Sequence, residues 1–235
     1  SSSDDAIEID EESVVNGGII NNDTGVISSD AAAAIEINDD AIVNGGITNS
    51  GEISSDGDDA IEIINGATLN GGISNTGNIT STDNDAIEII NGATLNGGIS
   101  NTGSGVISTS AGDAIFIDTA DSTLANGLYN TSTISSTDDD VVDVDHESSS
   151  ISGTINNTGT MTALDSVIEN TGTIEAINNS GRMEATDTAG IDLEDGSTLG
   201  SLVNSGTIKG PSALLIDSNA TVSDGITNTG VLDGA

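Results

Sequence analysis

The chain of 235 residues has no cysteine and no tryptophan, and Phe116 and Tyr129 are its only aromatic residues other than histidine. An extracellular protein with a continuous core need not use disulfides, so the lack of cysteine leaves the cellular compartment open. Without aromatic side chains, the core has to be built from Ile, Val, Leu and Ala in thin layers. The composition therefore favours a narrow, elongated fold over one thick globular core.

Basic residues are also scarce, because only Arg182 and Lys209 oppose 39 acidic residues and the formal net charge is −37. Nucleic-acid phosphates and anionic lipids are bound through lysine and arginine, so we expect no nucleic-acid partner and no docking on an anionic membrane. No apolar run approaches the roughly 20 residues of a transmembrane helix, so we expect no direct membrane insertion. Strong acidity favours solubility and attracts cations. A disordered acidic chain is the alternative, but the apolar residues recur periodically, which argues against it.

The dominant feature of the sequence is an internal repeat. The 18 residues from Ala60 to Gly77 recur unchanged from Ala86 to Gly103, 26 residues later, and looser copies begin at Ala6 and continue to the C-terminus. A period of this length, with short β-branched runs between Gly and Asn turns, predicts a solenoid.

Each repeat contains three short strand signals separated by Asn, Gly, Asp or Ser. The first strands begin near Ala6, Ala34, Ala60, Ala86, Ala114, Val141, Ser166, Gly190 and Ala213. The second strands close on Ile19, Ile47, Ile73, Ile99, Leu128, Ile155, Ile177, Val203 and Ile226. The third strands carry Ile27, Ile53, Ile79, Ile107, Ile134, Met161, Met183, Ile208 and Leu232.

This pattern predicts an all-β fold, a right-handed parallel β-helix of about nine coils with 22–28 residues and three short strands each. We expect residues 1–235 to form one solenoid domain without obvious caps, a rod about 40 Å long at about 4.8 Å per coil. Alternation should send Ile61 and Ile63 inward and Glu62 outward. Asparagines at the corners, such as Asn49, Asn75 and Asn101, are expected to form stacked amide ladders.

Acidic residues should stack in columns along the rod, because outward positions repeat as inward ones do. One column comprises Glu8, Glu36, Glu62 and Glu88. An Asp-rich corner precedes the same strands, with Asp56, Asp58, Asp59, Asp83, Asp85, Asp113, Asp138, Asp139 and Asp140. Two carboxylates about 5 Å apart repel by roughly 1 kcal/mol in water, so such columns call for salt, protons or bound cations. We hypothesise a Ca²⁺ site at this corner; the alternative is a solvated acidic face, and no known Ca²⁺-loop motif is present.

Lys209 tests this alignment of coils, because it should lie between Glu184 on the preceding coil and Asp233 on the following one. Such an exposed pair is worth under about 1 kcal/mol.

Catalysis is not expected, and no catalytic residue or organic cofactor is assigned. The segment Asp145-His146-Glu147-Ser148 contains the residue types of a triad, but consecutive residues of an extended segment cannot converge on one point. A polysaccharide-processing β-helix would need clustered acids, often with a basic residue, in an outer groove; here Arg182 and Lys209 are isolated and aromatic sugar platforms are missing. Ice binding is a further alternative, but the outward column of Thr48, Ser74 and Ser100 is interrupted by Tyr129.

An Asn-Ser/Thr-Gly-x-Ile unit recurs at 49–53, 75–79, 170–174 and 204–208. It resembles the repeats of autotransporter passengers and related haemagglutinin-like bacterial surface proteins. The resemblance covers nearly the whole chain and implies a secreted β-helix at the bacterial cell surface, with adhesion or a structural stalk as its role.

Coil-like sequence runs from Asp4 to Gly234, so we expect either a slice of a longer rod or a subunit that stacks end to end with itself. The sequence thus predicts a secreted structural protein that forms a rod or a head-to-tail filament with an adhesive or matrix role. The alternative is the passenger stalk of an autotransporter adhesin that binds a host, surface or glycan ligand.

Overall fold

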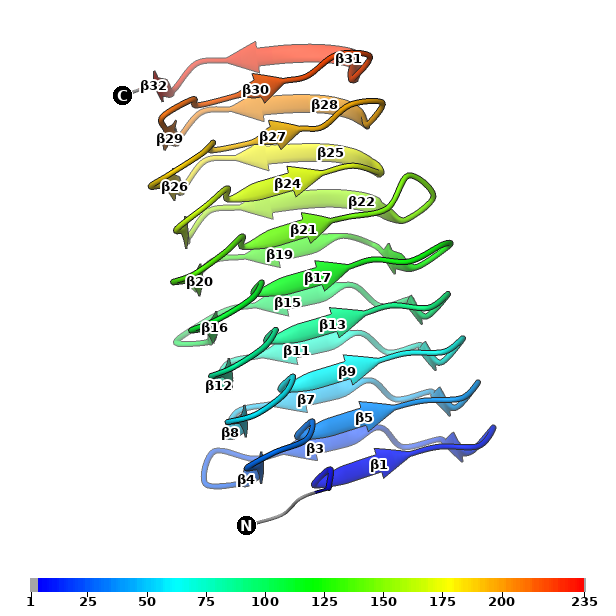
Figure 1. The fold of residues 1–235 in the computed structure, drawn as a ribbon. Coiled ribbons are helices and arrows are strands. Elements are labelled where there is room, and N and C mark those ends of the chain that lie inside the picture. Colours follow the sequence, from blue (N-terminus) through cyan, green and yellow to red (C-terminus); the bar gives the residue numbers. More distant parts are fainter. Residues whose placement is uncertain (1–3, 235) are drawn as a thin grey trace.

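A computed structural model describes residues 4–234, and these form a parallel β-solenoid of nine coils that contains no helix. The predicted fold class is confirmed. In Figure 1 the strands nearest the viewer run from left to right and those behind run from right to left as the chain rises, so the coil is right-handed. The predicted single domain, 1–235, stays a prediction, and its residues 1–3 and 235 lie outside the described part. Within that part, no helix could cross a bilayer.

Three parallel sheets form the walls of the solenoid, and we call them sheets A, B and C. Sheet A holds the first strand of every coil. It comprises β1 (Ile7–Ile9), β5 (Ile35–Ile37), β9 (Ile61–Ile63), β13 (Ile87–Ile89), β17 (Ile115–Ile117), β21 (Val142–Val144), β24 (Ile168–Asn170), β27 (Asp192–Leu193) and β30 (Leu215–Ile216).

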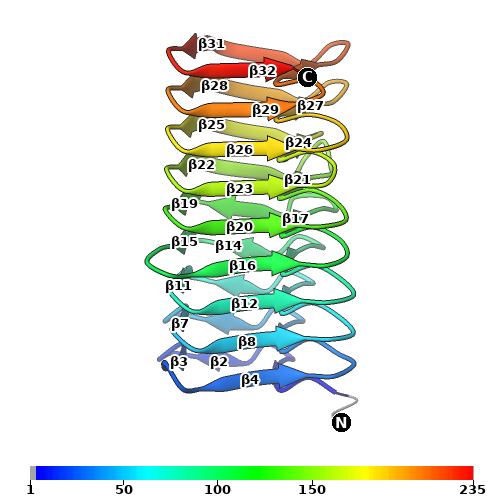
Figure 2. The same ribbon diagram turned by 90° about the vertical axis from the view of Figure 1, so that its left-hand side faces the viewer.

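Sheet C holds the last strand of every coil and faces the viewer in Figure 2, where β4 is lowest and β32 highest. It comprises β4 (Val26–Ser29), β8 (Glu52–Ser55), β12 (Asn78–Ser81), β16 (Val106–Thr109), β20 (Thr133–Ser136), β23 (Thr160–Ala163), β26 (Arg182–Ala185), β29 (Thr207–Gly210) and β32 (Val231–Gly234).

Sheet B changes its construction along the rod. In the first five coils it is made of two short strands per coil: β2 (Val14–Val15) and β3 (Ile19–Asn21), β6 (Ile42–Val43) and β7 (Ile47–Asn49), β10 (Thr68–Leu69) and β11 (Ile73–Asn75), β14 (Thr94–Leu95) and β15 (Ile99–Asn101), β18 (Thr123–Ala125) and β19 (Leu128–Asn130). In the last four it is made of one longer strand: β22 (Ser150–Asn157), β25 (Thr173–Asn179), β28 (Thr198–Asn204) and β31 (Thr221–Asn228).

The division of sheet B in the early coils follows from an Asn-Gly-Gly turn, which in the fifth coil is replaced by Asn126-Gly127. The predicted three strands per coil are confirmed as three sheets, and in these coils the second strand is divided into two short pieces. Gly72, for example, has a φ of +74°, which is left-handed and interrupts a strand. A Cβ atom on Gly72 would also lie 2.6 Å from the carbonyl oxygen of Gly98 on the next coil. The chain thus needs glycine here both for its backbone angle and for the close approach of coils.

We expect Gly72→Ala to lower the free energy of unfolding by about 3 kcal/mol or more, because a strained backbone adds to a clash between coils. Gly196→Ala isolates the backbone term, since Gly196 has a φ of +85° but no atom near its Cβ position. It should cost about 1 kcal/mol. Urea unfolding of both variants measures the two changes. Equal decreases in the free energy of unfolding would show that the close approach of the coils at Gly72 does not affect stability.

The core consists of stacked aliphatic side chains that repeat at the same position in every coil. Almost all predicted inward residues occupy these positions; Ile35, Ile61 and Ile87, for example, pair in register through sheet A and are fully buried. Branched side chains stacked in register exclude water along the whole axis. The hydrophobic effect on these stacks is the main force that holds the coils together.

One predicted inward residue is wrong. The structure places Leu202 in the stack between Ile177 and Ile226, whereas Val203 pairs with Thr227 on the outer side and is 42% exposed. Side chains alternate between the two faces of a strand, so a misalignment of one residue exchanges inside and outside.

A ladder of asparagines runs along the corner between sheets B and C, and all of its members except Asn228 are buried. Each Nδ2 atom donates to the Oδ1 atom of the asparagine on the next coil, at 2.8–3.0 Å. The members are Asn21, Asn49, Asn75, Asn101, Asn130, Asn157, Asn179, Asn204 and Asn228. The predicted ladder is confirmed and extends over all nine coils. All its bonds point the same way, so the ladder has a direction.

The alignment of the last coils is confirmed by Lys209, which pairs in register with Glu184 and Asp233. Its Nζ atom lies 3.2 Å from Glu184 Oε1, and Arg182 contacts the same carboxylate. These side chains are partly exposed, so each pair contributes under about 1 kcal/mol.

Candidate cation-binding face

A second ladder, made of aspartates, lies at the corner between sheets C and A. Asp59, Asp85, Asp113 and Asp140 are almost completely buried. The Oδ1 atom of each accepts a backbone N–H from the next coil, at 2.5–2.9 Å, and the last of these donors is Ser166. These carboxylates therefore already act as acceptors for the turn backbone.

The predicted Asp-rich corner is divided by the structure into this buried ladder and an outer rim. Asp56, Asp83 and Asp138 are exposed on the rim, and Asp139 lies beside the ladder. Asp58 is partly buried and accepts a hydrogen bond from Asn84 Nδ2 at 3.2 Å. Three of the nine predicted ligands come together as a group, with one carboxylate oxygen each within 4.8 Å of the others. They are Asp113, Asp139 and Asp140.

The outward column of sheet A continues beyond the four predicted glutamates. Glu8, Glu36, Glu62 and Glu88 pair in register, as predicted. After Phe116, the column resumes as Asp143, Glu169 and Asp192. Sequence reasoning missed these three residues, although their place between two inward residues, as in Val142-Asp143-Val144, was a signal that could have identified them.

Column residues and corner residues meet in groups of three carboxylates. In two overlapping groups in the C-terminal half, one oxygen from each residue lies within 4.8 Å of the others; Glu169 belongs to both, joined in one by Asp140 and Asp143 and in the other by Asp192 and Glu194. The N-terminal half has corresponding groups. These are Asp5, Glu8 and Glu36, and Asp59, Glu62 and Glu88.

Burial and crowding raise the pKa of these carboxyl groups. Desolvation is the main cause, and neighbouring carboxylates add to it. The pKa of Asp113 rises to about 9, that of Asp140 to about 8 and that of Asp143 to about 10. The pKa of Glu169 rises to about 7 and that of Asp192 to about 6. At neutral pH the face therefore needs protons or cations to offset its charge.

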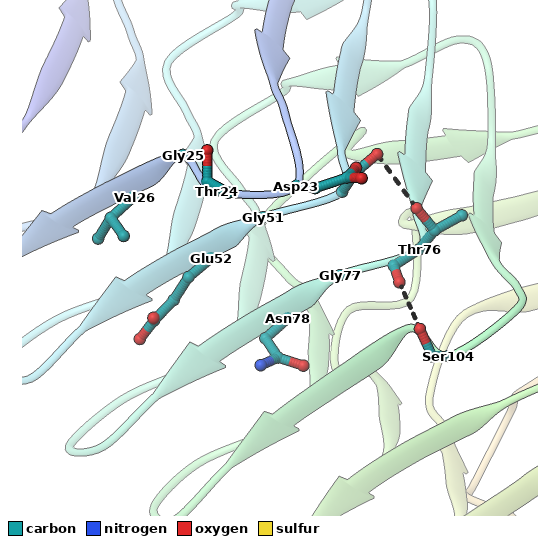
Figure 3. A pocket seen from close by; sticks show the side chains of 11 residues that line it. Asp23, Thr24, Gly25, Val26, Gly51, Glu52, Thr76, Gly77, Asn78 and Ser104 are labelled. Carbon is teal, nitrogen blue, oxygen red and sulfur yellow. Dashed lines mark hydrogen bonds between the residues drawn. The ribbon is translucent and has the colours of Figure 1, made fainter.

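A shallow groove of about 430 Å³ lies on another part of the surface, at the turns that lead into β4, β8 and β12 (Figure 3). Its wall carries hydroxyl groups: Thr76 Oγ1 donates to Ser50 Oγ at 3.3 Å, and Ser104 Oγ donates to the Thr76 carbonyl at 3.1 Å. Asp23 and Glu52 also line it. The groove offers hydrogen-bonding groups to a polar ligand, and the predicted surface or glycan ligand stays a prediction.

The segment around His146 forms the turn between β21 and β22. The backbone N–H of Ser148 donates to His146 Nδ1 at 3.1 Å, and Ser148 Oγ lies 3.1 Å from the same nitrogen. Both contacts are local, two residues apart in the chain, and they stabilise the turn.

Comparison of the chain with protein-family models, with curated proteins and with solved structures finds no match. Function has therefore to be argued from the coils and from their acidic face. The two features that stand out are the directional asparagine ladder and the stacked carboxylates.

Proposed function

We propose that this chain is a structural protein of a bacterial cell surface or extracellular matrix, a rigid rod that stacks head to tail with copies of itself. The observation that supports this most directly is the match between the two end coils. The first and last described coils present complementary faces to one another. The resemblance of the repeats to secreted bacterial surface proteins supports the extracellular location.

The inward side chains of the two end coils correspond position by position. In the last coil, Ile216 and Ile226 are each 44% exposed and Leu232 is 37% exposed. Residues at the equivalent positions of inner coils are buried, because another coil covers them. The first coil offers a matching set of aliphatic side chains at the same strand positions. These are Ile7, Ile9, Val15, Ile19 and Ile27.

The asparagine ladder sets the direction of stacking. At the last coil, the only contact of Asn228 Nδ2 within residues 4–234 is a long one of 3.4 Å, to the Gly230 carbonyl. At the first coil, Asn21 Nδ2 donates to Asn49 Oδ1, and no donor among the described residues reaches Asn21 Oδ1. A donor end thus meets an acceptor end only in a head-to-tail arrangement. Contact of this kind does not close on itself, so it builds an open filament.

The experiment is electron microscopy of the purified chain, with sedimentation to measure mass, at low and high salt. Salt matters because a net charge of −37 on each copy opposes assembly. We expect unbranched filaments with a rise of about 40 Å per copy, favoured by high salt.

Ile226→Lys tests the interface, because it places a charge on the inward surface of the last coil. Val203→Lys is the matched control, since Val203 is exposed to a similar degree, 42%, but lies on the side of the rod. We expect the first variant to remain a short rod and the second to assemble like the parent. Short rods of the parent under all conditions, or filaments of Ile226→Lys, would contradict head-to-tail stacking and favour a stalk that displays its lateral faces.

A further inference from the structure

Two aspartates in the outward column of sheet A are buried without hydrogen-bond partners. Asp143 is 8% exposed and Asp192 is 2% exposed. The Oδ1 atom of each is inaccessible to solvent and has no hydrogen bond. This contrasts with the aspartate ladder, where Oδ1 accepts a backbone N–H. A buried oxygen without a hydrogen-bond donor destabilises the folded state, so a ligand that contacts these atoms would stabilise it.

The neighbours of Asp143 and Asp192 in the column are further carboxylates. Glu169 lies between Asp143 and Asp192 in the column, because the three pair in register through β21, β24 and β27. Glu169 belongs to two groups, one with Asp140 and Asp143 and one with Asp192 and Glu194. Within each group, one oxygen of every residue lies within 4.8 Å of the others. Arg182 belongs to β26 and Lys209 to β29, both in sheet C, where they contact Glu184.

The irregular sets of carboxylate oxygens in these groups suit Ca²⁺ better than Mg²⁺. Two ligands of the same ion can be separated by at most twice the metal–oxygen distance, which is about 4.6–5.2 Å for Ca²⁺ and about 4.0–4.2 Å for Mg²⁺. Oxygens that lie within 4.8 Å of one another are close enough to share one Ca²⁺. Calcium also accepts irregular sets of carboxylates, whereas Mg²⁺ requires a near-ideal octahedron.

We propose that this column binds Ca²⁺ at two adjacent positions that share Glu169: with Asp140 and Asp143 between the sixth and seventh coils, and with Asp192 and Glu194 between the seventh and eighth. The site lies on the strands of sheet A and shares only Asp140 with the Asp-rich corner. The corner is the poorer site, because backbone N–H groups already occupy its buried carboxylates. An ion at each position joins two successive coils, and it takes the place of the missing hydrogen-bond donor of Asp143 or of Asp192.

The test is calorimetric titration of CaCl₂ into the chelator-treated full chain at about pH 7.5 and about 150 mM KCl, which screens diffuse attraction. We expect saturable binding that stabilises the protein toward heat. Asp143→Asn combined with Asp192→Asn should weaken binding by about tenfold or more, because two of the charged ligands are lost. Asp23→Asn combined with Asp224→Asn removes the same charge from exposed sites elsewhere and should change the affinity by less than about twofold.

Equal weakening in both double variants, or an absence of saturable heat in the parent, would overturn the site. If Ca²⁺ binding is weakened instead by Asp56→Asn combined with Asp83→Asn, the ion lies at the Asp-rich corner. Should the first double variant fail to fold, a crystal of the parent soaked in a lanthanide provides a second test, because its anomalous signal must lie beside Asp143 and Asp192. None of these coils is at an end of the rod, so the result is independent of stacking, and Ile226→Lys can be used to keep the rods short.

Discussion

Replacing Asn101 with aspartate is expected to lower the free energy of unfolding at pH 7 by about 3–5 kcal/mol, the range for an uncompensated charge in a protein interior. Asn101 is fully buried in the middle of the asparagine ladder. Its Nδ2 atom donates to Asn130 Oδ1 at 3.0 Å and to the Thr133 carbonyl at 2.9 Å. A carboxylate would turn both contacts into repulsions between acceptors, while the bond from Asn75 would remain.

The matched control is Asn70→Asp. Asn70 belongs to a second, exposed line of asparagines, where its Nδ2 atom donates to Asn44 Oδ1 at 2.9 Å. The chemical change is the same, but water can solvate the new charge, so the loss should stay below about 1 kcal/mol. Urea unfolding followed by circular dichroism measures both. Similar losses in the two variants would mean that burial of the ladder contributes nothing to its strength.

With divalent cations removed by a chelator, we expect the free energy of unfolding to decrease by at least about 3 kcal/mol between pH 5 and pH 9. The reason is the raised pKa of the buried carboxyl groups. The pKa of Asp85 rises from 3.8 to about 6 and that of Asp113 from 3.8 to about 9, mainly through desolvation. The folded state therefore holds protons that the unfolded state has released, at about 1.4 kcal/mol per pKa unit.

The direction follows from proton linkage. Over this range the folded state binds more protons than the unfolded state, so the unfolding free energy decreases as pH increases. The stabilisation is complete below the unfolded value of 3.8 and is lost as the pH passes through about 6 and then about 9. Most proteins with paired carboxylates behave in the opposite way, because pairing lowers the pKa.

Asp59→Asn makes the pH prediction specific. Burial, reinforced by Glu88 and Asp85, raises the pKa of Asp59, and its Oδ1 atom accepts the N–H of Asp85 at 2.9 Å. Asparagine can keep this hydrogen bond without the charge, so it should stabilise the protein at pH 8 by about 1–3 kcal/mol and flatten the pH profile. Asp83→Asn, at an exposed position of the same corner, should leave the profile unchanged. A parent stability that rises with pH, or an Asp59→Asn variant that is less stable at pH 8, would contradict this explanation.

Much of the fold could be predicted because the repeat between Ala60 and Gly103 is strict. Identical residues at identical positions can stack in only one register, and this register determined the inward columns and the place of Lys209. Prediction failed where the repeat loosens. In the segment from Leu199 to Val203 two apolar residues stand side by side, and only pairing with Ile177 and Ile226 selects Leu202 as the inward one.

The candidate site was predicted less completely than the fold. Sequence reasoning identified acidic columns, since charge and period are properties of the chain itself. It could not tell which carboxylates lie buried with backbone donors, as Asp113 does, and which lie buried without one, as Asp143 does. Exposure and hydrogen bonding depend on how one coil covers the next.

The sequence by itself determined the architecture of this protein: a periodic chain of aliphatic and Gly-Asn units must coil, and its repeated acidic residues must stack in columns. Only the tertiary structure decided the rest. It gave the asparagine ladder its direction, divided sheet B at the glycine turns, and left Asp143 and Asp192 without donors. The physical reason is that hydrogen bonds and solvation are set by contacts between residues about 25 positions apart, which no single repeat contains.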